Sequence, residues 1–303
     1  PNIDFKTSIA GGAGLKVKTG YQSVGDEVEG IDYLMLDFDK EVIEISADYA
    51  NLSVLGALQV RGATTLAKKN EEVYVKGSNT KTAVQTLAIG TKDVSAFIGV
   101  GDYFNTPTEA VGFAVTDLDL AAVLMTPTNL NGDLVQYFAV NANLQSAGLV
   151  GMGDVLTAKI SKFNLEANVS ILNGSLSDGL DNVIDFSRSG ENDTAYKVKT
   201  GSEDNFISLD YDSFLTKTSG HMKLGAYGMF EIDTFFDMEI TTDSFGLFIG
   251  EGIASIGTED THKIAGVNVE GIIAINKDGL ATNLKVNSGL DLGDAFALEN
   301  DFK

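Results

Sequence analysis

Aspartates spaced two residues apart are the side chains in this sequence best placed to bind an ion. Asp37 and Asp39 form one pair, and Asp210 and Asp212 form a second pair at the matching place of a repeated motif. In a β-strand, residues i and i+2 share a face, so each pair of carboxylates repels unless a cation such as calcium neutralises it. The simpler interpretation, which the sequence favours, is that both carboxylates face water while their apolar neighbours pack inward.

The junctions between repeated units offer a second kind of cation site, because turns supply main-chain carbonyls as well as carboxylates. Residues 173–182 combine Asn, Ser, Asp and Gly, and residues 287–294 are their counterpart. Both segments contain Gly-Leu-Asp, at 179–181 and at 289–291. Asp and Gly occur in turns without any ion, but their recurrence makes this junction the first choice for calcium. The candidate ligands there are Asp178, Asp181, Asp185, Asp291 and Asp294.

Catalytic chemistry has little support in the sequence. The two histidines, His221 and His262, fall in non-equivalent parts of the repeats. A Ser-His-Asp assembly could use either one, but no GxSxG motif precedes a helix. Paired carboxylates could also hydrolyse glycosidic bonds, but a sugar groove needs aromatic platforms and the chain has no Trp. Cys is absent as well, which excludes thiolate catalysis and disulfides, so we expect no enzymatic activity.

The charge of the chain restricts its partners. It carries 43 acidic and 21 basic residues, for a net charge of −22, and Arg61 and Arg188 are its two arginines. Nucleic-acid binding needs clustered Lys and Arg, so that class of partner is excluded. A solvated acidic surface in a salt-rich setting and a set of true cation sites both fit the excess of acid. Because no apolar run reaches 18 residues, we expect no transmembrane helix.

Internal repetition is the strongest organising feature of the sequence. The pentapeptide KVKTG occurs at residues 16–20 and again at 197–201, and an Asp-Phe motif recurs at 2–6, 183–187 and 299–303. We therefore predict one module over residues 1–182, a second and shortened module over 183–298, and the start of a third at 299–303. A start and a stop inside a repeat would indicate an excerpt of a longer chain. Tandem modules usually provide length or multivalency rather than a single reaction centre.

Alternation of apolar and polar residues predicts strands along most of the chain. Residues 267–275 and 280–287 alternate on either side of an Asn-Lys-Asp-Gly turn, which is a hairpin signal because Gly tolerates a positive φ. No segment has the caps and periodicity of a convincing helix. We predict an all-β chain with an elongated tandem-repeat architecture of long, mostly antiparallel strands, either β-solenoid-like or an extended β-meander.

Three segments resemble repeats of very large secreted bacterial proteins of the adhesin type. These are residues 96–101 (AFIGVG), residues 109–120 (EAVGFAVTDLDL) and residues 165–172, followed by the Asp-Phe boundary. The resemblance implies a secreted or cell-surface protein in which such modules act as stalk or scaffold. Many of those proteins also carry calcium-binding nonapeptides of the form GGxGxDxUx. Here residues 11–16 place Lys16 where the Asp belongs, so calcium binding does not follow from that motif.

These observations lead to one principal functional expectation and one alternative. The principal expectation is a non-enzymatic extracellular structural repeat, a stalk, filament or surface-scaffold segment, with calcium as the cation that would rigidify it. Its partners would be neighbouring repeats of the same or like chains and divalent cations. The alternative is a porin-like outer-membrane β-barrel, which fits the high Gly, the low Pro and the alternating strands. Against it stand the lack of aromatic girdles and the final residues, Phe302 and Lys303.

Overall fold

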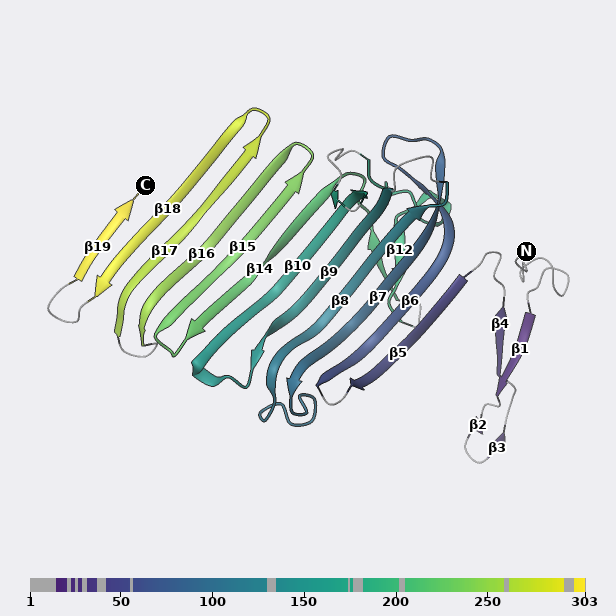
Figure 1. Cartoon of the computed structure of the whole chain (residues 1–303), viewed down its shortest axis with the longest axis horizontal. Helices are drawn as coiled ribbons and strands as arrows, with labels where there is room; N and C mark the ends of the chain where they lie inside the picture. The colour runs from purple at the N-terminus through teal and green to yellow at the C-terminus, as the bar shows by residue number, and fades with distance from the viewer. Residues whose placement is uncertain are drawn as a thin grey trace.

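One antiparallel sheet dominates the structure (Figure 1). The computed structural model describes residues 15–20, 23–24, 27–28, 32–36, 42–54, 57–129, 135–173, 175–176, 182–201, 205–258, 262–291 and 297–302. Within these residues the strands lie in the order β19-β18-β17-β16-β15-β14-β10-β9-β8-β7-β6-β5, and the short β11 also pairs with β10. Strands that are adjacent in the sheet are therefore consecutive in the chain, apart from the step from β10 to β14. The sheet is open, with β5 and β19 at opposite edges.

The sheet strands are long, as the alternating pattern predicts. In chain order they are β5 (Val42–Val54), β6 (Leu58–Tyr74), β7 (Lys81–Val100), β8 (Val111–Pro127), β9 (Val135–Val150), β10 (Leu156–Leu172), β11 (Ser175–Leu176), β14 (Leu215–Ala226), β15 (Phe230–Thr241), β16 (Ser244–Thr258), β17 (His262–Asn276), β18 (Gly279–Asp291) and β19 (Ala297–Phe302). Smaller pairs are made by β1 (Leu15–Gly20) with β4 (Asp32–Leu36), β2 (Ser23–Val24) with β3 (Glu27–Val28), and β12 (Tyr196–Lys199) with β13 (Phe206–Leu209).

The fold class predicted from the sequence is confirmed, and the arrangement is that of an extended β-meander. In the described part of the chain, helical geometry is limited to two 3-10 turns, Gly153–Val155 and Glu191–Asp193. The described residues contain no helix with the length and apolar character needed to span a membrane.

The predicted hairpin at residues 276–279 is also confirmed. Asn276 pairs with Gly279 across the turn that joins β17 to β18. The Asn276 side-chain oxygen accepts hydrogen bonds from the main-chain N–H of Asp278 at 2.9 Å and from that of Gly279 at 3.2 Å. Gly279 has φ +143°, a value that favours glycine. The turn residues therefore set the register of β17 and β18, the two strands that they join.

Both predicted modules contribute strands to the same sheet. β10 of the first repeat pairs with β14 of the second from Leu156↔Ala226 to Asn168↔Leu215. The predicted module boundary at residue 183 thus falls between two strands that are hydrogen-bonded neighbours. No break in the sheet separates the repeats.

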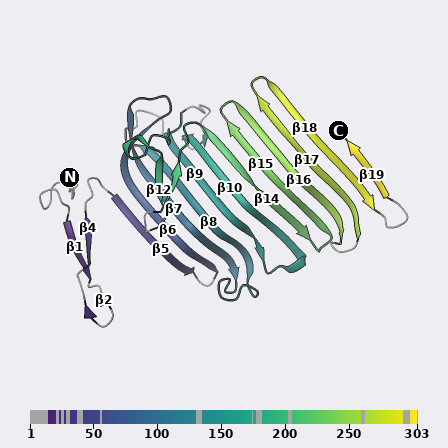
Figure 2. The same cartoon turned by 180° about the vertical axis from the view of Figure 1, so that it is seen from behind.

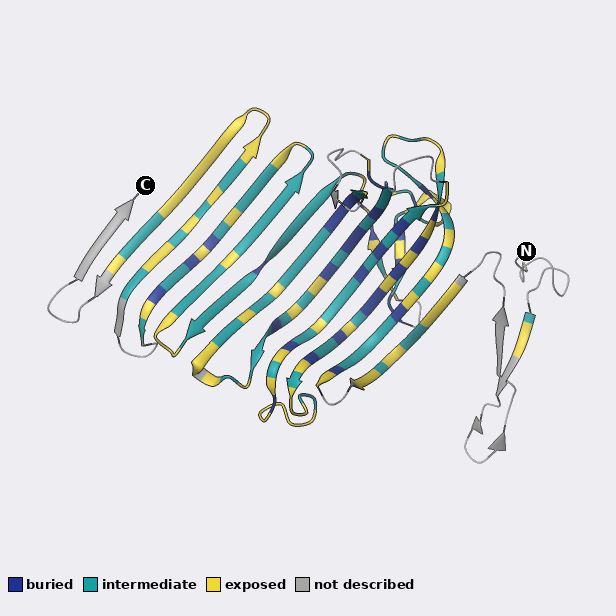
Figure 3. Cartoon of the chain, in the orientation of Figure 1, coloured by how far each residue is buried: buried dark blue, intermediate teal, exposed yellow. Residues whose placement is uncertain are grey.

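The segment between β10 and β14 forms a second layer, which we call the strap (residues 183–214, described except for 202–204). It contains β12 and β13 and crosses one face of the sheet, where β12 lies against β7 and β8, and β13 against β8 and β9 (Figure 2). Most of the fully buried side chains lie beneath it, whereas the strands from β14 onward are mainly intermediate or exposed (Figure 3). The hydrophobic core is therefore confined to one end of the sheet.

The two faces of the sheet differ sharply in chemistry, as two adjacent cross-strand rows show. Directly paired residues of neighbouring strands share a face. One row lies on the face opposite the strap, here called the open face; from β5 to β18 it reads Ile45, Leu66, Ile89, Ala122, Val140, Ala167, Thr216, Ile240, Phe245, Ile275 and Leu280. The adjacent row lies on the strap face; it reads Ser46, Thr65, Gly90, Ala121, Asn141, Glu166, Lys217, Glu239, Gly246, Ala274 and Ala281. The open-face row carries no charge across eleven strands, while the strap-face row is small and polar.

Candidate docking site at the repeat junction

The Asp-Phe motif of the second repeat fastens the start of the strap to the end of β6. The main-chain N–H of Lys76 donates to the Val183 carbonyl at 2.8 Å, and the N–H of Asp185 donates to the Tyr74 carbonyl at 2.8 Å. Val75 and Ile184 form the β-bridge between them. Tyr74 and Val183 are far apart in the sequence, so this contact closes a long loop and fixes where the strap begins.

Apolar side chains of the strap fill the space above the sheet. Phe186 is 0% exposed, and its ring meets that of Tyr196 edge-on with centroids 5.7 Å apart. The side chains that form the cluster on the sheet side are mostly small. They include Ala88, Ala121, Val123, Met125 and Ala139. A second layer can approach closely over such residues, so the strap and the sheet share one core.

Gly90 shows how close the approach is. A Cβ atom on Gly90 would lie 1.9 Å from the Lys199 carbonyl oxygen and 2.8 Å from the Lys199 carbonyl carbon. Both are main-chain atoms of β12, so no side-chain rotation could relieve the clash. Glycine is required at this position because the strap backbone lies directly over it.

An ion pair within the strap uses the carboxylate of Asp185. Arg188 donates from Nε to Asp185 Oδ2 at 2.6 Å, and Ser187 donates its hydroxyl to Asp185 Oδ1 at 2.6 Å. The same guanidinium donates from Nη2 to the Ser78 carbonyl at 2.7 Å and lies over the Tyr74 ring at 4.2 Å. Arg188 therefore neutralises Asp185 and binds the strap to the loop after β6.

Two polar side chains of the sheet form hydrogen bonds to the strap. Asn168 of β10 is 0% exposed, and its Nδ2 donates to the carbonyls of Ile184 and Ser213, each at 2.9 Å. It therefore bonds to both ends of the strap. Glu71 of β6 accepts a hydrogen bond from the Tyr196 hydroxyl at 2.7 Å. Burial, with the Glu71 charge as a smaller cause, raises the pKa of Tyr196 well above its usual value, so the hydroxyl stays protonated and can donate.

The strap ends on a second tyrosine. The Tyr211 hydroxyl donates to the Val140 carbonyl at 3.2 Å. Burial raises the pKa of Tyr211, and the nearby carboxylates of Glu166 and Asp210 add to the effect. Each tyrosine thus places a neutral hydroxyl on a buried acceptor of the sheet.

The carboxylates proposed as calcium ligands are not gathered into one site by the described residues. Asp210 and Asp212 flank the buried Tyr211 and are exposed, in the extended segment after β13 rather than within a strand. Asp185 is held by Arg188 and Ser187, as described above. In the part of the chain that the structure describes, no three His, Asp or Glu side chains converge as a metal-binding group. Asp37, Asp39, Asp178, Asp181 and Asp294 lie outside the described residues, and for Asp291 only the main chain at the end of β18 is described.

A Ser-His-Asp line crosses β10, β14 and β15 on the strap face. His221 Nδ1 lies 3.3 Å from the Ser161 hydroxyl, and His221 Nε2 makes a short contact with Asp233 Oδ1. The imidazole also stacks on Phe235 with ring centroids 4.3 Å apart. Ser161, His221 and Asp233 all pair within strand ladders, so nearby main-chain N–H groups are used by the sheet and do not form an oxyanion hole. The arrangement is that of a cross-strand polar contact.

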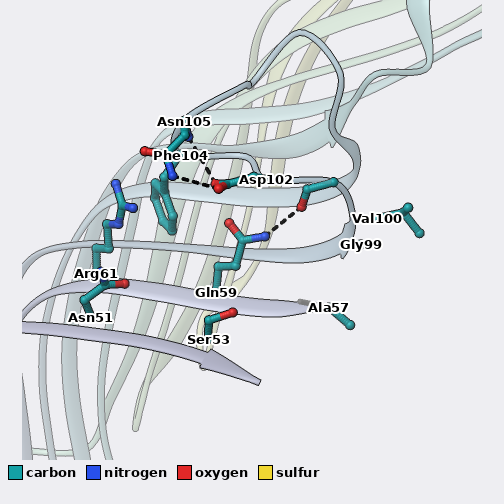
Figure 4. Close-up of a pocket in the computed structure, with 11 residues that line it drawn as sticks. Asn51, Ser53, Ala57, Gln59, Arg61, Gly99, Val100, Asp102, Phe104 and Asn105 are labelled. Carbon is teal, nitrogen blue, oxygen red and sulfur yellow. Dashed lines mark hydrogen bonds between the residues drawn. The ribbon is translucent and has the colours of Figure 1, made fainter. Parts of the chain in front are cut away.

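A hollow of about 610 Å³ opens beside the loop that joins β7 to β8 (Figure 4). Gln59 donates from Nε2 to the Gly101 carbonyl at 2.7 Å, and Asn105 donates from Nδ2 to Asp102 Oδ2 at 2.7 Å. That hydrogen bond is the main cause of the lowered pKa of Asp102. The Arg61 guanidinium lies 4.3 Å from the centroid of the Phe104 ring. These contacts support the loop, and the lining has one carboxylate and no histidine, so it lacks the pair of groups that acid–base catalysis needs.

Sequence reasoning identified the repeated motifs but missed their use as a docking site. The missed residues include Asn168, Glu71, Gly90 and Arg188. Only the Asp-Phe repeat pointed to the junction, and it did so without indicating a partner strand. No protein-family model, curated protein or solved structure matches the chain.

Proposed function

We propose that this chain is a non-enzymatic structural repeat, a scaffold or stalk segment of the adhesin-like type, that works by joining modules into one continuous sheet. The observation that carries the proposal is the shared ladder of β10 and β14, in which the last long strand of one repeat pairs with the first long strand of the next. A binding module or enzyme is expected to end its sheet at the edge of the domain. Here the second repeat extends the sheet of the first.

The mechanical role follows from the strap. A single sheet layer would bend and slip in register, whereas a second layer that contacts β6 to β10 fixes those strands relative to one another. Strap and ladder together transmit load from one repeat to the next. The main-chain hydrogen bond from Asp185 to Tyr74 and the double hydrogen bond of Asn168 are points where the two layers are fastened.

The open face supports a place within a larger assembly. Eleven strands at a spacing of about 4.8 Å make that face about 50 Å wide. Ile45, Leu66 and Leu280, toward the two edges of this row, are more than 40% exposed, whereas Val140 and Ala167 near its centre are buried. Exposed apolar patches on free monomers rarely exceed a few hundred Å², so a face of this extent is expected to be covered when the protein is assembled.

An extracellular or cell-surface location and calcium as a stiffening ion belong to the same proposal. Their support is the resemblance to secreted repeats, the absence of Cys and the net charge of −22. Divalent cations would reduce the repulsion between acidic side chains of successive modules.

Small-angle scattering with and without millimolar calcium, together with a thermal melt, tests this proposal. We expect an elongated, flat particle that needs no detergent, and a higher melting temperature with calcium. An elongated particle whose shape and melting temperature do not change with calcium would support the scaffold function and contradict a stiffening role for calcium. A compact particle, or a chain that is stable only in detergent, would contradict the scaffold and favour the outer-membrane alternative.

Catalysis is tested separately at the Ser161–His221–Asp233 line. We expect ester hydrolysis by the chain to equal that of Ser161→Ala. Turnover that is lost in Ser161→Ala would contradict a purely structural role.

A further inference from the structure

A second pair of strands in the chain, β1 with β4, has the same register as the pair β12 and β13 of the strap. β1 and β12 share the tripeptide Lys-Val-Lys of the repeated KVKTG motif. β1 pairs with β4 as Leu15↔Leu36, Lys16↔Met35, Val17↔Leu34 and Lys18↔Tyr33. β12 pairs with β13 as Tyr196↔Leu209, Lys197↔Ser208, Val198↔Ile207 and Lys199↔Phe206. The two strand pairs therefore have the same register at four successive positions.

The two hairpins differ in what covers them. Val198 of β12 is 2% exposed because it faces the sheet, whereas its counterpart Val17 of β1 is 38% exposed. The β1–β4 hairpin lies beyond the β5 edge of the sheet (Figure 1). The chain therefore contains a second strand pair of the kind that packs on the sheet, and its Val17 is exposed where Val198 is buried.

The strap face offers a matching uncovered surface at the other end of the sheet. Asn168 marks this face, because it bonds to the strap, and it pairs with Leu215. Two steps of two residues along β14 lead from Leu215 to Ser219. From Ser219 the register defines one row on the same face, made of Ser219, Asp237, Phe248, Ile272 and Asn283. Phe248 and Ile272 are 42% and 47% exposed, so the centre of this row is apolar and open.

Small and acidic residues surround that apolar centre. Gly246, Ala274 and Ala281 lie in the adjacent row of the strap face, as small residues do beneath the strap. Asp237 pairs directly with Phe248, and Glu239 pairs with Gly246. The β1–β4 hairpin carries Lys16 and Lys18 on either side of Val17. These two lysines match Lys197 and Lys199 of the strap hairpin. In the strap, the lysine that matches Lys18 is Lys199, which forms an ion pair with Glu44 of the sheet at 2.9 Å.

The hairpin of the same chain cannot reach this surface. Five residues separate Leu36 of β4 from Val42 of β5, and an extended chain of that length spans about 20 Å. β16 lies eight strands away from β5 in the sheet, a distance of about 38 Å at about 4.8 Å per strand. A β1–β4 hairpin docked on β16 to β18 must therefore belong to another molecule.

We propose that the β1–β4 hairpin of a second copy of this chain docks on the strap face of β16, β17 and β18, as β12–β13 docks on β7 to β9. The contact is head-to-tail, since hairpin and acceptor lie at opposite ends of each molecule. Such a contact joins different patches and does not close on itself, so it builds open chains of molecules. The inference rests on the proposed scaffold function and specifies how successive molecules join.

Complementation between two blocked variants tests the proposal. Val17→Asp blocks the hairpin and leaves the acceptor intact, while Ile272→Asp blocks the acceptor and leaves the hairpin intact. By sedimentation velocity we expect the unmodified chain to form a concentration-dependent series of oligomers and each variant to stay at 32.1 kDa. An equimolar mixture should give a particle of twice that mass and nothing larger, because only one productive contact remains.

Ile275→Asp is the matched control. Ile275 lies on the same strand as Ile272 and is 46% exposed, but its side chain is on the open face. We expect this variant to oligomerise like the unmodified chain. Each of three results would overturn the proposal. The oligomers could be lost in Ile275→Asp as well, the mixture of blocked variants could stay at the mass of one chain, or the unmodified chain could stay monomeric up to millimolar concentration. An elongated monomer in any of those cases would leave the scaffold function standing.

A deletion keeps the test decisive if Val17→Asp alters the hairpin itself. A chain lacking residues 1–39 retains every strand of the large sheet. It should be monomeric alone and should form a heterodimer with Ile272→Asp, which supplies an intact hairpin to its acceptor. It should not pair with Val17→Asp, since neither of those two chains supplies a working hairpin. Oligomers of the shortened chain would overturn the proposal.

Discussion

Asn168 is the side chain on which the attachment of the strap depends most directly. Its amide nitrogen bonds to Ile184 and Ser213, at the two ends of a segment that is otherwise held by packing. Loss of the amide would leave two buried carbonyls without these donors, and each such loss costs about 1–3 kcal/mol.

We predict that Asn168→Ala lowers the free energy of unfolding by about 2–4 kcal/mol, measured by urea denaturation. Asn283→Ala is the control, because Asn283 is also an asparagine in a strand on the strap face but is exposed. It should change stability by less than about 0.5 kcal/mol. Equal effects of the two substitutions would show that Asn168 does not hold the strap.

Gly90 provides a second test at the residue scale. Gly90→Ala forces a methyl group against the Lys199 carbonyl, so we predict that the strap shifts and that stability falls by about 2–3 kcal/mol. Gly246→Ala is the matched control, since nothing lies within 4 Å of the position its Cβ would take on the same face. Melting temperatures of the two variants check this; a Gly90→Ala chain as stable as the control would contradict the close approach.

The strap is the element whose stability should depend on pH. The folded-state pKa values of Tyr196 and Tyr211 are both raised above the ordinary value of 10.0. The folded strap therefore keeps phenolic protons that the unfolded chain releases, and its stabilisation is complete below pH 10 and falls as the pH rises further.

We accordingly predict that the strap detaches in alkali before the sheet unfolds. Tyrosinate absorbance at 295 nm should show a late, cooperative component above pH 10. Hydrogen exchange of residues 183–214 should accelerate over the same range. Tyr196→Phe should remove part of the late rise in tyrosinate absorbance, while the amides of β7 and β8 stay protected from hydrogen exchange. Simple titration of every tyrosine near pH 10, with an intact strap, would contradict the prediction.

At the scale of the elements, the sequence predicted strands and turns well because these depend on local pattern. The alternation of residues 280–287 and the Asn276 turn determine β18 and its register without help from distant residues. The strap was not predicted, because its partners are distant in sequence. Asn168 and Ser213 are 45 residues apart, and Glu71 and Tyr196 are 125 apart. Asp185 could be identified as a repeated acid, but nothing in its pattern distinguished Arg188 from a cation as the group that neutralises it.

At the scale of the whole molecule, the separation of charge explains how an acidic chain can form a flat sheet. Lys217 with Glu239, Lys223 with Glu231, and His221 with Asp233 all face the strap side. The row opposite contains no charged residue from Ile45 to Leu280. Composition alone predicted an acidic surface, but it could not show that one cross-strand row is free of charge, because that depends on the register of every strand.

Continuity of the sheet across the two repeats is the central claim, and hydrogen exchange of individual amides tests it most directly. We predict that the amides of β10 and β14 that pair with each other, between Leu156↔Ala226 and Asn168↔Leu215, exchange as slowly as those shared by β8 and β9. We also predict that they exchange together as one cooperative unit. Exchange of β14 at the rate of an unfolded chain, while β8 and β9 stay protected, would contradict the account, because the two repeats would then be independent units.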